Sequence, residues 1–290
     1  PGERFAPEQF ANDVWKIDLS TMSADKVGEL PEGCQSMASV GWGRRGANMI
    51  VGGLGPVDGK VQSRTHAFRW DMRRGEAVPY EAQMEAPRTQ CQVVDYDGKV
   101  YVIGGIDFTP DARGGTTQGD TRELLVFDPE ADEPKFELAG IQMPRPRRSF
   151  GAAVLGDKLY LIGGLGEGFQ HAGPCDVYDF KSGAWSELEA PTEWVSPQVT
   201  TIDDTMYVAC GITMRGRSAK QDRSVAAFKA GSGWSTVVEE LPFATRHVQM
   251  MTSRNRLLFY SANDKQRDRI VIRTFEPDRS VIVPDWSFHR

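Results

Sequence analysis

Short runs of apolar residues that end in glycine recur along the chain. The clearest run, in residues 157–166 (DKLYLIGGLG), follows Gly156 and stops at Gly163 and Gly164. Apolar runs of this length between turn residues are typical of β-strands, and a Gly-Asp pair before such a run is typical of a tight hairpin turn. The pattern therefore predicts a hairpin whose second strand stops at a glycine pair.

The same phrase occurs several times in phase. Copies end at Gly53, Gly105, Gly164 and Gly211, and a degraded copy ends at Ala262, so that successive ends are 52, 59, 47 and 51 residues apart. This period lies in the range of propeller blades. Each copy has a strand and a turn before it and a variable loop after it. An aromatic residue, in most copies followed by an acidic one, and a last segment with a large apolar residue complete the unit. We therefore expect four strands per unit.

The units divide the whole chain, which we expect to form a single domain over residues 1–290. Residues 12–30 predict only the third and fourth strands of a unit, because VWKID resembles LLVFD in a complete one. The five complete units are expected at about 35–84, 89–139, 148–188, 196–238 and 246–283.

These units resemble the kelch repeat. The matching parts are the double glycine, the Tyr/Phe-Asp pair and the tryptophan of the fourth strand, which occur together in residues 159–185. The resemblance covers nearly the whole chain and implies an all-β fold, a kelch-type β-propeller with six blades of four antiparallel strands, one of them incomplete in this chain. The glycine pair then serves close approach of the backbone. No GxGxxG or GxxxxGK[ST] spacing accompanies it, so a phosphate-binding loop is not expected.

Composition and charge narrow the function. The formal charge of −6 argues against nucleic-acid binding, and no apolar stretch approaches the length needed to span a membrane. The first ten residues show no signal-peptide pattern, which leaves the compartment open between export, the periplasm and the cytoplasm. The four cysteines lie far apart, so we expect buried small side chains rather than a metal centre or a disulfide framework.

The long loops indicate where a ligand would bind. In a four-stranded meander, the connections from strand two to three and from strand four to one emerge on the same face. Binding residues concentrate on long loops of a rigid scaffold, so we expect this face to bind. The insertions assigned to it are 54–64, 106–122, 165–174, 212–222 and 262–268.

A set of equivalent positions is expected at the mouth of the central channel. Counting back eleven residues from the start of each second strand gives Arg88, Arg147, Trp194, a position one short of Arg246, and a small polar residue near Ser36. Arginine pairs with carboxylates in a bidentate manner, so the set predicts a site for a carboxylate, a sugar acid or an acidic peptide. Arg122 and Arg215 are expected to extend it from the loops. The alternative is that these arginines belong to the repeat consensus and pair with acidic residues of the neighbouring blades.

We expect a binding scaffold for a protein partner or a small anionic ligand, without a metal or other cofactor. The competing hypothesis is a carbohydrate-active enzyme, because the resemblance extends to N-acetylneuraminate epimerase, a kelch sialic acid mutarotase. That resemblance implies Glu167 as the catalytic residue. A copper-radical site like that of galactose oxidase is not expected, because none of the four histidines adjoins a tyrosine, and no GxSxG motif is present.

Overall fold

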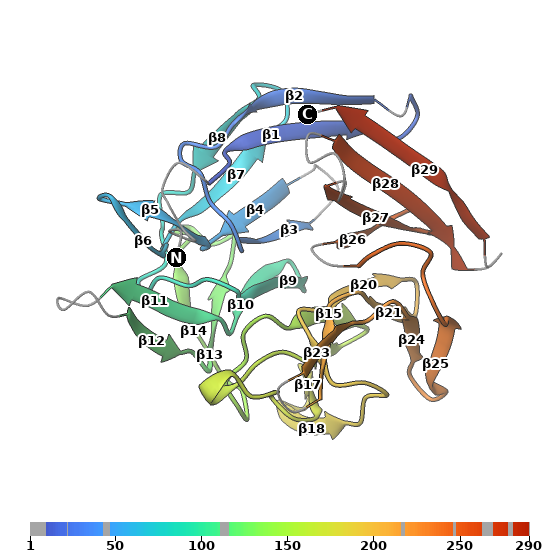
Figure 1. Ribbon diagram of the computed structural model, residues 1–290. Helices are drawn as coiled ribbons and strands as arrows, with labels where there is room; N and C mark the ends of the chain where they lie inside the picture. Colours follow the sequence, from blue (N-terminus) through green and yellow to red (C-terminus); the bar gives the residue numbers. More distant parts are fainter. Residues whose placement is uncertain are drawn as a thin grey trace. The chain divides into compact units, whose positions relative to one another are not determined.

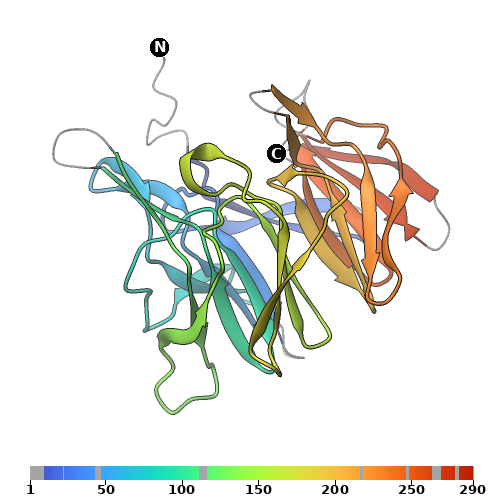
Figure 2. The same cartoon turned by 90° about the horizontal axis from the view of Figure 1, so that it is seen from below.

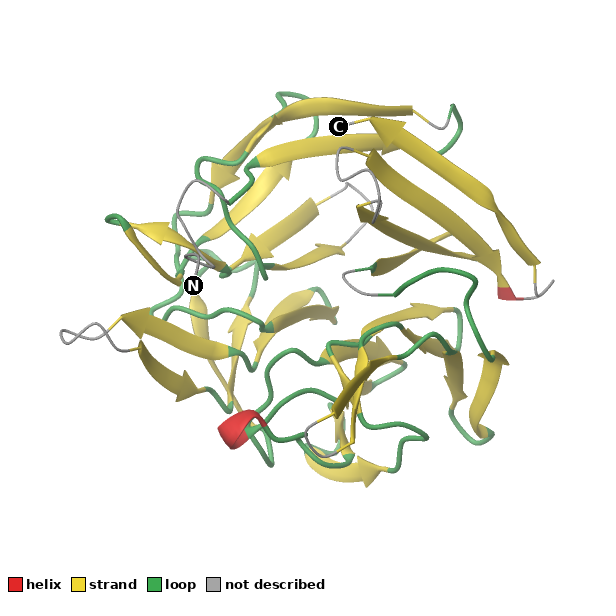
Figure 3. Ribbon diagram, viewed as in Figure 1, coloured by secondary structure: helices red, strands yellow, loops and turns green. Residues whose placement is uncertain are grey.

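The computed structural model consists mainly of strands joined by loops and turns (Figure 3). It describes residues 10–21, 23–42, 47–110, 116–215, 218–245, 248–262, 269–277 and 281–289. Within these ranges there is no α-helix, and no helical segment is long and apolar enough to cross a membrane. A short 3₁₀ turn, η2, covers Glu167–Phe169.

The chain divides into two compact units. Unit 1 comprises Pro1–Lys16, Asp25–Arg148 and Gly166–Gly168, and unit 2 comprises Ile17–Ala24, Ser149–Leu165 and Phe169–Arg290. That the two form one domain stays a prediction.

Unit 1 contains two four-stranded antiparallel sheets, blades 1 and 2, whose first strands β3 and β9 contact each other (Figure 1). Blade 1 consists of β3 (Ala38–Trp42), β4 (Ala47–Val51), β7 (Ala67–Asp71) and β8 (Glu76–Pro79). Blade 2 consists of β9 (Gln92–Tyr96), β10 (Lys99–Ile103), β13 (Glu123–Phe127) and β14 (Phe136–Gln142).

Unit 2 contains three such sheets, blades 3 to 5, with contacts between the first strands of consecutive blades. Blade 3 consists of β15 (Gly151–Leu155), β16 (Lys158–Ile162), β17 (Cys175–Asp179) and β18 (Ala184–Leu188). Blade 4 consists of β20 (Gln198–Ile202), β21 (Thr205–Ala209), β24 (Val225–Lys229) and β25 (Gly233–Val238). Blade 5 consists of β26 (Gln249–Ser253), β27 (Arg256–Ala262), β28 (Arg269–Glu276) and β29 (Val281–His289).

A two-stranded sheet, β1 (Asp13–Asp18) with β2 (Ser23–Glu29), corresponds to the expected incomplete blade. Asp18 at the end of β1 accepts hydrogen bonds from the backbone N–H groups of Ser20 and Thr21. Asp71 and Asp179 cap the turn after the third strand of blades 1 and 3 in the same way, and these backbone hydrogen bonds lower the pKa of both carboxyls. The acidic residue of the repeat is therefore a turn cap, and β1 has the character of a third strand.

The aromatic residues of the repeat form cross-strand pairs. An aromatic side chain on the third strand lies opposite one on the fourth strand, with ring centroids 5.0–5.1 Å apart. Such pairs stabilise a sheet beyond the apolar area that they bury. The pairs are Phe127–Phe136, Tyr178–Trp185 and Phe228–Trp234.

Each glycine pair forms a backbone hydrogen bond with the segment that follows its own blade. Gly53, Gly105 and Gly164 each donate their N–H, at 2.8 Å, to a carbonyl just before the next blade. The first glycine of the pair has a positive φ, and a Cβ on Gly52 or Gly163 would overlap that same carbonyl group. Only glycine tolerates both the positive φ and the close approach of this carbonyl group. The accepting carbonyls belong to Arg88, Arg147 and Trp194.

Apolar clusters fill the space between neighbouring sheets. Between blades 1 and 2 the cluster includes Met49 and Val51 from β4 and Val100 and Val102 from β10, all fully buried. Other clusters lie within unit 2 and between blade 1 and the β1–β2 pair. Burial of this kind is the main source of stability for a sheet protein.

Three of the expected irregular loops form hairpins instead. Asp58 and Gly59 both have positive φ, as a two-residue hairpin turn requires, so the segment after blade 1's glycine pair folds back on itself. The expectation of irregular insertions was wrong at these places. The hairpins are β5 (Leu54–Val57) with β6 (Lys60–Ser63), β11 (Ile106–Pro110) with β12 (Thr116–Asp120), and β22 (Ile212–Arg215) with β23 (Ser218–Gln221), to which β19 (Trp194–Val195) adds a third strand.

Candidate functional site

The expected channel residues share one backbone position. Arg88, Arg147 and Trp194 each lie two residues before a residue with positive φ. Those residues are Gln90, Ser149 and Ser196, and the fourth of the kind is Ser36. The blade 1 member of the set is therefore Cys34 rather than a polar residue near Ser36. The error arose because the length of the turn in blade 1 could not be read from the sequence.

Arg88 is an interior side chain, with 3% of its surface exposed. Its Nη1 donates to the carbonyl of Glu123 at 3.1 Å and to that of Gly104 at 3.5 Å. The guanidinium thus ties together the end of strand two and the start of strand three in its own blade.

Arg147 and Trp194 are buried as deeply, each 1% exposed. The Trp194 indole N–H donates to a carboxylate oxygen of Asp222 at 2.5 Å, and its ring packs against Trp234. A ligand-binding role for Arg88, Arg147 and Trp194 stays a prediction, and Arg246 lies outside the described residues.

Arg122 bonds to backbone carbonyls at the end of blade 2. Its Nε and Nη2 donate to Met143, and Nη2 also donates to Pro144. Arg223 occupies the same position in blade 4 and donates to Leu241 in the same way. Arg215 lies at the end of β22, and its side chain is outside the described part. A role for Arg122 and Arg215 in ligand binding stays a prediction.

Glu167 lies on the surface of η2, in an exposed turn that also presents Phe169. The bridge between Leu165 and His171 closes this turn. The described residues contain no cluster of three His, Cys, Asp or Glu side chains that would hold a metal ion.

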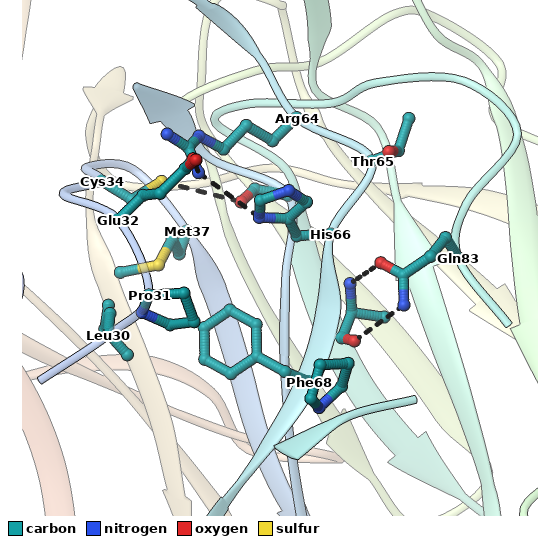
Figure 4. A pocket seen from close by; sticks show the side chains of 13 residues that line it. Leu30, Pro31, Glu32, Cys34, Met37, Arg64, Thr65, His66, Phe68 and Gln83 are labelled. Carbon is teal, nitrogen blue, oxygen red and sulfur yellow. Dashed lines mark hydrogen bonds and ion pairs between the residues drawn. The ribbon is translucent and has the colours of Figure 1, made fainter. Parts of the chain in front are cut away.

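A pocket of about 480 Å³ lies in unit 1, beside the root of the β5–β6 hairpin (Figure 4). One side is apolar, and Figure 4 shows Glu32, Cys34, Arg64 and His66 grouped at the other end. The apolar side is made by Leu30, Pro31, Met37, Phe68 and Pro79.

Arg64 is fixed at the polar end of the pocket. Its Nη1 lies 2.5 Å from a carboxylate oxygen of Glu32, and its Nη2 donates to the carbonyls of Pro56, at 2.5 Å, and Gly33, at 3.4 Å. The Arg64 side chain is almost fully buried, whereas that of Glu32 is 54% exposed. The ion pair leaves this end of the pocket without net charge.

His66 is held neutral. Burial, followed by the charge of Arg64, lowers the pKa of its imidazole. Because a guanidinium only donates, the 3.4 Å contact from Arg64 Nη1 makes His66 Nδ1 an acceptor, and the ring proton then sits on Nε2.

Cys34 is half-buried at the pocket, so the expectation of a buried small side chain was wrong for this cysteine. Burial raises the pKa of its thiol, which contacts the carbonyl of Gly52 at 3.8 Å. Cys91, Cys175 and Cys210 are buried, as expected.

Sequence reasoning missed the pocket residues Glu32, Arg64 and His66. Arg64 and His66 sit where the other repeats have unrelated residues, so no pattern marks them. The one readable signal is Cys34, a small residue at a position where three other blades carry arginine or tryptophan.

Repeated four-stranded sheets joined through glycine pairs define a β-propeller assembled from repeats. Residues 2–211 match the family model described as the KLHDC2/KLHL20/DRC7 kelch-repeats domain. The chain belongs to the kelch-repeat family.

Relatives and a solved structure agree with this assignment. The chain is 26% identical over 229 residues to Kelch-like protein terF of Aspergillus terreus, covering 75% of this chain and 48% of that protein. It is 27% identical over 122 residues to Kelch-like protein 40a of Danio rerio, covering 41% of this chain and 19% of the relative. The matches thus span less than half of each relative's length.

The solved structure of YjhT superimposes with a TM-score of 0.73 at 15% sequence identity, covering 94% of this chain and 92% of that one. This likeness confirms the predicted kelch-type propeller fold.

Proposed function

We propose that the chain is a kelch binding module that holds a protein partner on the paired hairpins β5–β6 and β11–β12. The observation that carries this proposal is the cross-link between them. Ser63 Oγ of β6 accepts the N–H of Phe108 at 2.8 Å and lies 3.4 Å from the carbonyl of Ile106. The two hairpins lie side by side in unit 1 (Figures 1 and 2).

A cross-linked pair of hairpins suits recognition because it is ordered before binding. Less conformational entropy is then lost when a partner docks. Exposed Lys60 at the turn of β5–β6 is available for contact. No catalytic group is needed for this function.

Site-specific photocrosslinking tests the proposal. A photoreactive residue at Lys60 is expected to capture a defined partner, whereas one at exposed Arg74, in the turn between β7 and β8, is the matched control. The purified partner should bind the parent chain and bind Lys60→Glu at least tenfold more weakly. Equal capture at both positions would overturn the proposal.

Sugar-acid mutarotation at Glu167 is the second candidate. Its support is the exposure of Glu167 on η2. Nuclear magnetic resonance with N-acetylneuraminate would detect catalysed anomer exchange, and loss of that exchange in Glu167→Gln would establish it. Exchange no faster than in buffer would remove this candidate.

A further inference from the structure

The pocket in blade 1 takes the place that an arginine occupies in blade 2. In blade 2, Arg88 reaches the carbonyls of Gly104 and Glu123. The shared backbone register makes Cys34 the equivalent of Arg88. The glycine pairs and the third strands then make Gly52 the equivalent of Gly104 and His66 that of Glu123.

All three blade 1 equivalents line the pocket. Cys34 is too short to span it, and its thiol contacts the carbonyls of Gly52 and of the neighbouring Gln35, each at 3.8 Å. The His66 carbonyl accepts the Gly52 N–H at 2.8 Å and keeps a second lone pair. Two carbonyl groups that bind a guanidinium in blade 2 are thus left to a weak thiol contact in blade 1.

Arg64 does not fill the vacated place. Its donors are directed to Gly33, Pro56, Glu32 and the ring nitrogen Nδ1 of His66, rather than to the carbonyls of Gly52 or His66. Its charge is balanced by Glu32, so a second cation meets no net positive charge. Arg88 shows that a guanidinium at this position of the repeat is held by carbonyls.

The rest of the pocket matches an arginine side chain as well. The methylene stem of arginine packs on apolar surface while its head stays polar. Met37 and Phe68 provide that surface, and the half-exposed carboxylate of Glu32 lies beside the polar end. A neutral His66 adds no opposing charge.

We propose that this pocket binds an arginine side chain of a partner polypeptide, in the place that Arg88 fills from within in blade 2. The inference rests on the proposed function only for the source of the arginine. The pocket itself is tested with a small arginine derivative and no partner.

The first test restores the arginine within the chain. Cys34→Arg is expected to fold with an unfolding midpoint at or above that of the parent, because its guanidinium reaches the carbonyls of Gly52 and His66. Cys91→Arg is the matched control. Cys91 is buried among apolar side chains between blades 1 and 2, so this change should lower the midpoint by about 10 °C or more. Equal loss of folding in both variants counts against the proposal.

The second test titrates the parent chain with N-acetyl-L-arginine methylamide while the methyl resonance of Met37 is followed. Met72, an exposed residue of the same blade, is the control resonance. Saturable shifts at Met37 alone are expected, with at least about tenfold weaker binding of the uncharged citrulline analogue, since charge-assisted hydrogen bonds are lost. Folded Cys34→Arg should show no binding.

Equal binding of the two derivatives, or no shift at Met37, overturns the proposal even when Cys34→Arg fails to fold. If the titration fails but crosslinking at Lys60 is selective, the proposed arginine pocket is refuted and the proposed binding module stands. If arginine binds selectively but Lys60 captures no partner, the proposed partner site on the hairpins is refuted and the proposed pocket stands.

Discussion

Blades 1 and 2 share a backbone design and differ in how side chains secure it. Each has four strands in the same order and a hairpin after its glycine pair. In blade 2, Arg88 and Arg122 bond to backbone carbonyls at two points. Blade 1 has Cys34 and Thr65 at those points, and there the structure has a pocket.

The difference shows which features of the repeat are required. Hydrogen bonds from the glycine pairs run between backbone atoms and do not depend on the side chain of the accepting residue. Arginine and tryptophan can therefore both occupy the accepting position without changing this backbone bond. In blade 1, which has a cysteine at the equivalent position, the structure has a pocket.

The largest effect is expected where the two blades depend on each other. Gly52→Ala places a Cβ against the Arg88 carbonyl at a positive φ, so unfolding should become easier by about 3–5 kcal/mol. Gly98→Ala is the control: its φ is also positive, but no atom lies within 4 Å of the added Cβ, and about 1–2 kcal/mol is expected. Urea unfolding measures both. Equal losses of unfolding free energy in the two variants would show that the Arg88 carbonyl does not exclude a side chain at position 52.

The second largest difference in stability between the two blades is expected at the position of Arg88 and Cys34. Arg88→Ala leaves a cavity and two carbonyls without their donor, which should cost about 2–4 kcal/mol. Cys34→Ala removes only a thiol at an existing pocket and should cost less than about 1 kcal/mol. Chemical denaturation with both variants at one pH checks the difference, and similar costs would contradict the assignment of the two residues to one position.

A smaller contrast is expected at the outer arginine. Arg122→Ala removes hydrogen bonds to Met143 and Pro144 from a half-buried side chain, for a loss of about 1–2 kcal/mol. Thr65→Ala, at the same position in blade 1, should change stability by less than about 0.5 kcal/mol. Thermal unfolding of the two variants measures this contrast. A loss of stability in Thr65→Ala as large as that in Arg122→Ala would refute the comparison.

The smallest effect is a pH dependence specific to blade 1. The pKa of His66 is lowered from 6.5 in the fold by burial and by Arg64, so the folded state binds this proton less readily than the unfolded state. The stabilising contribution is complete above pH 6.5 and is lost as the pH falls through the folded pKa. The stability of the parent should therefore fall relative to His66→Gln between about pH 7 and pH 5. A constant difference across this range would contradict a neutral His66.

The periodic features could be predicted from the sequence because each depends on local chemistry. The glycine pairs, the Asp71 turn cap and the Tyr178–Trp185 pair all repeat, and each has the same role in several blades. The pocket could not be predicted because its residues are far apart in the sequence and come both from blade 1 and from the segment between β2 and β3. Glu32 meets Arg64 only after β5 and β6 have folded back, and the value of Cys34 is apparent only beside Arg88.

The hydrogen bond from the Gly53 N–H to the Arg88 carbonyl also determines when blade 1 can be completed during synthesis on the ribosome. Blade 1 has all four strands once β8 has emerged, yet the acceptor for Gly53 lies further along the chain. The same holds for Gly105 with Arg147 and for Gly164 with Trp194. Blades 1, 2 and 3 are therefore each left with an open glycine N–H donor until the residues just before the next blade leave the exit tunnel. A nascent chain halted directly after one of these blades lacks the acceptor carbonyl for its glycine N–H. A chain halted a few residues later contains that carbonyl and can form the hydrogen bond.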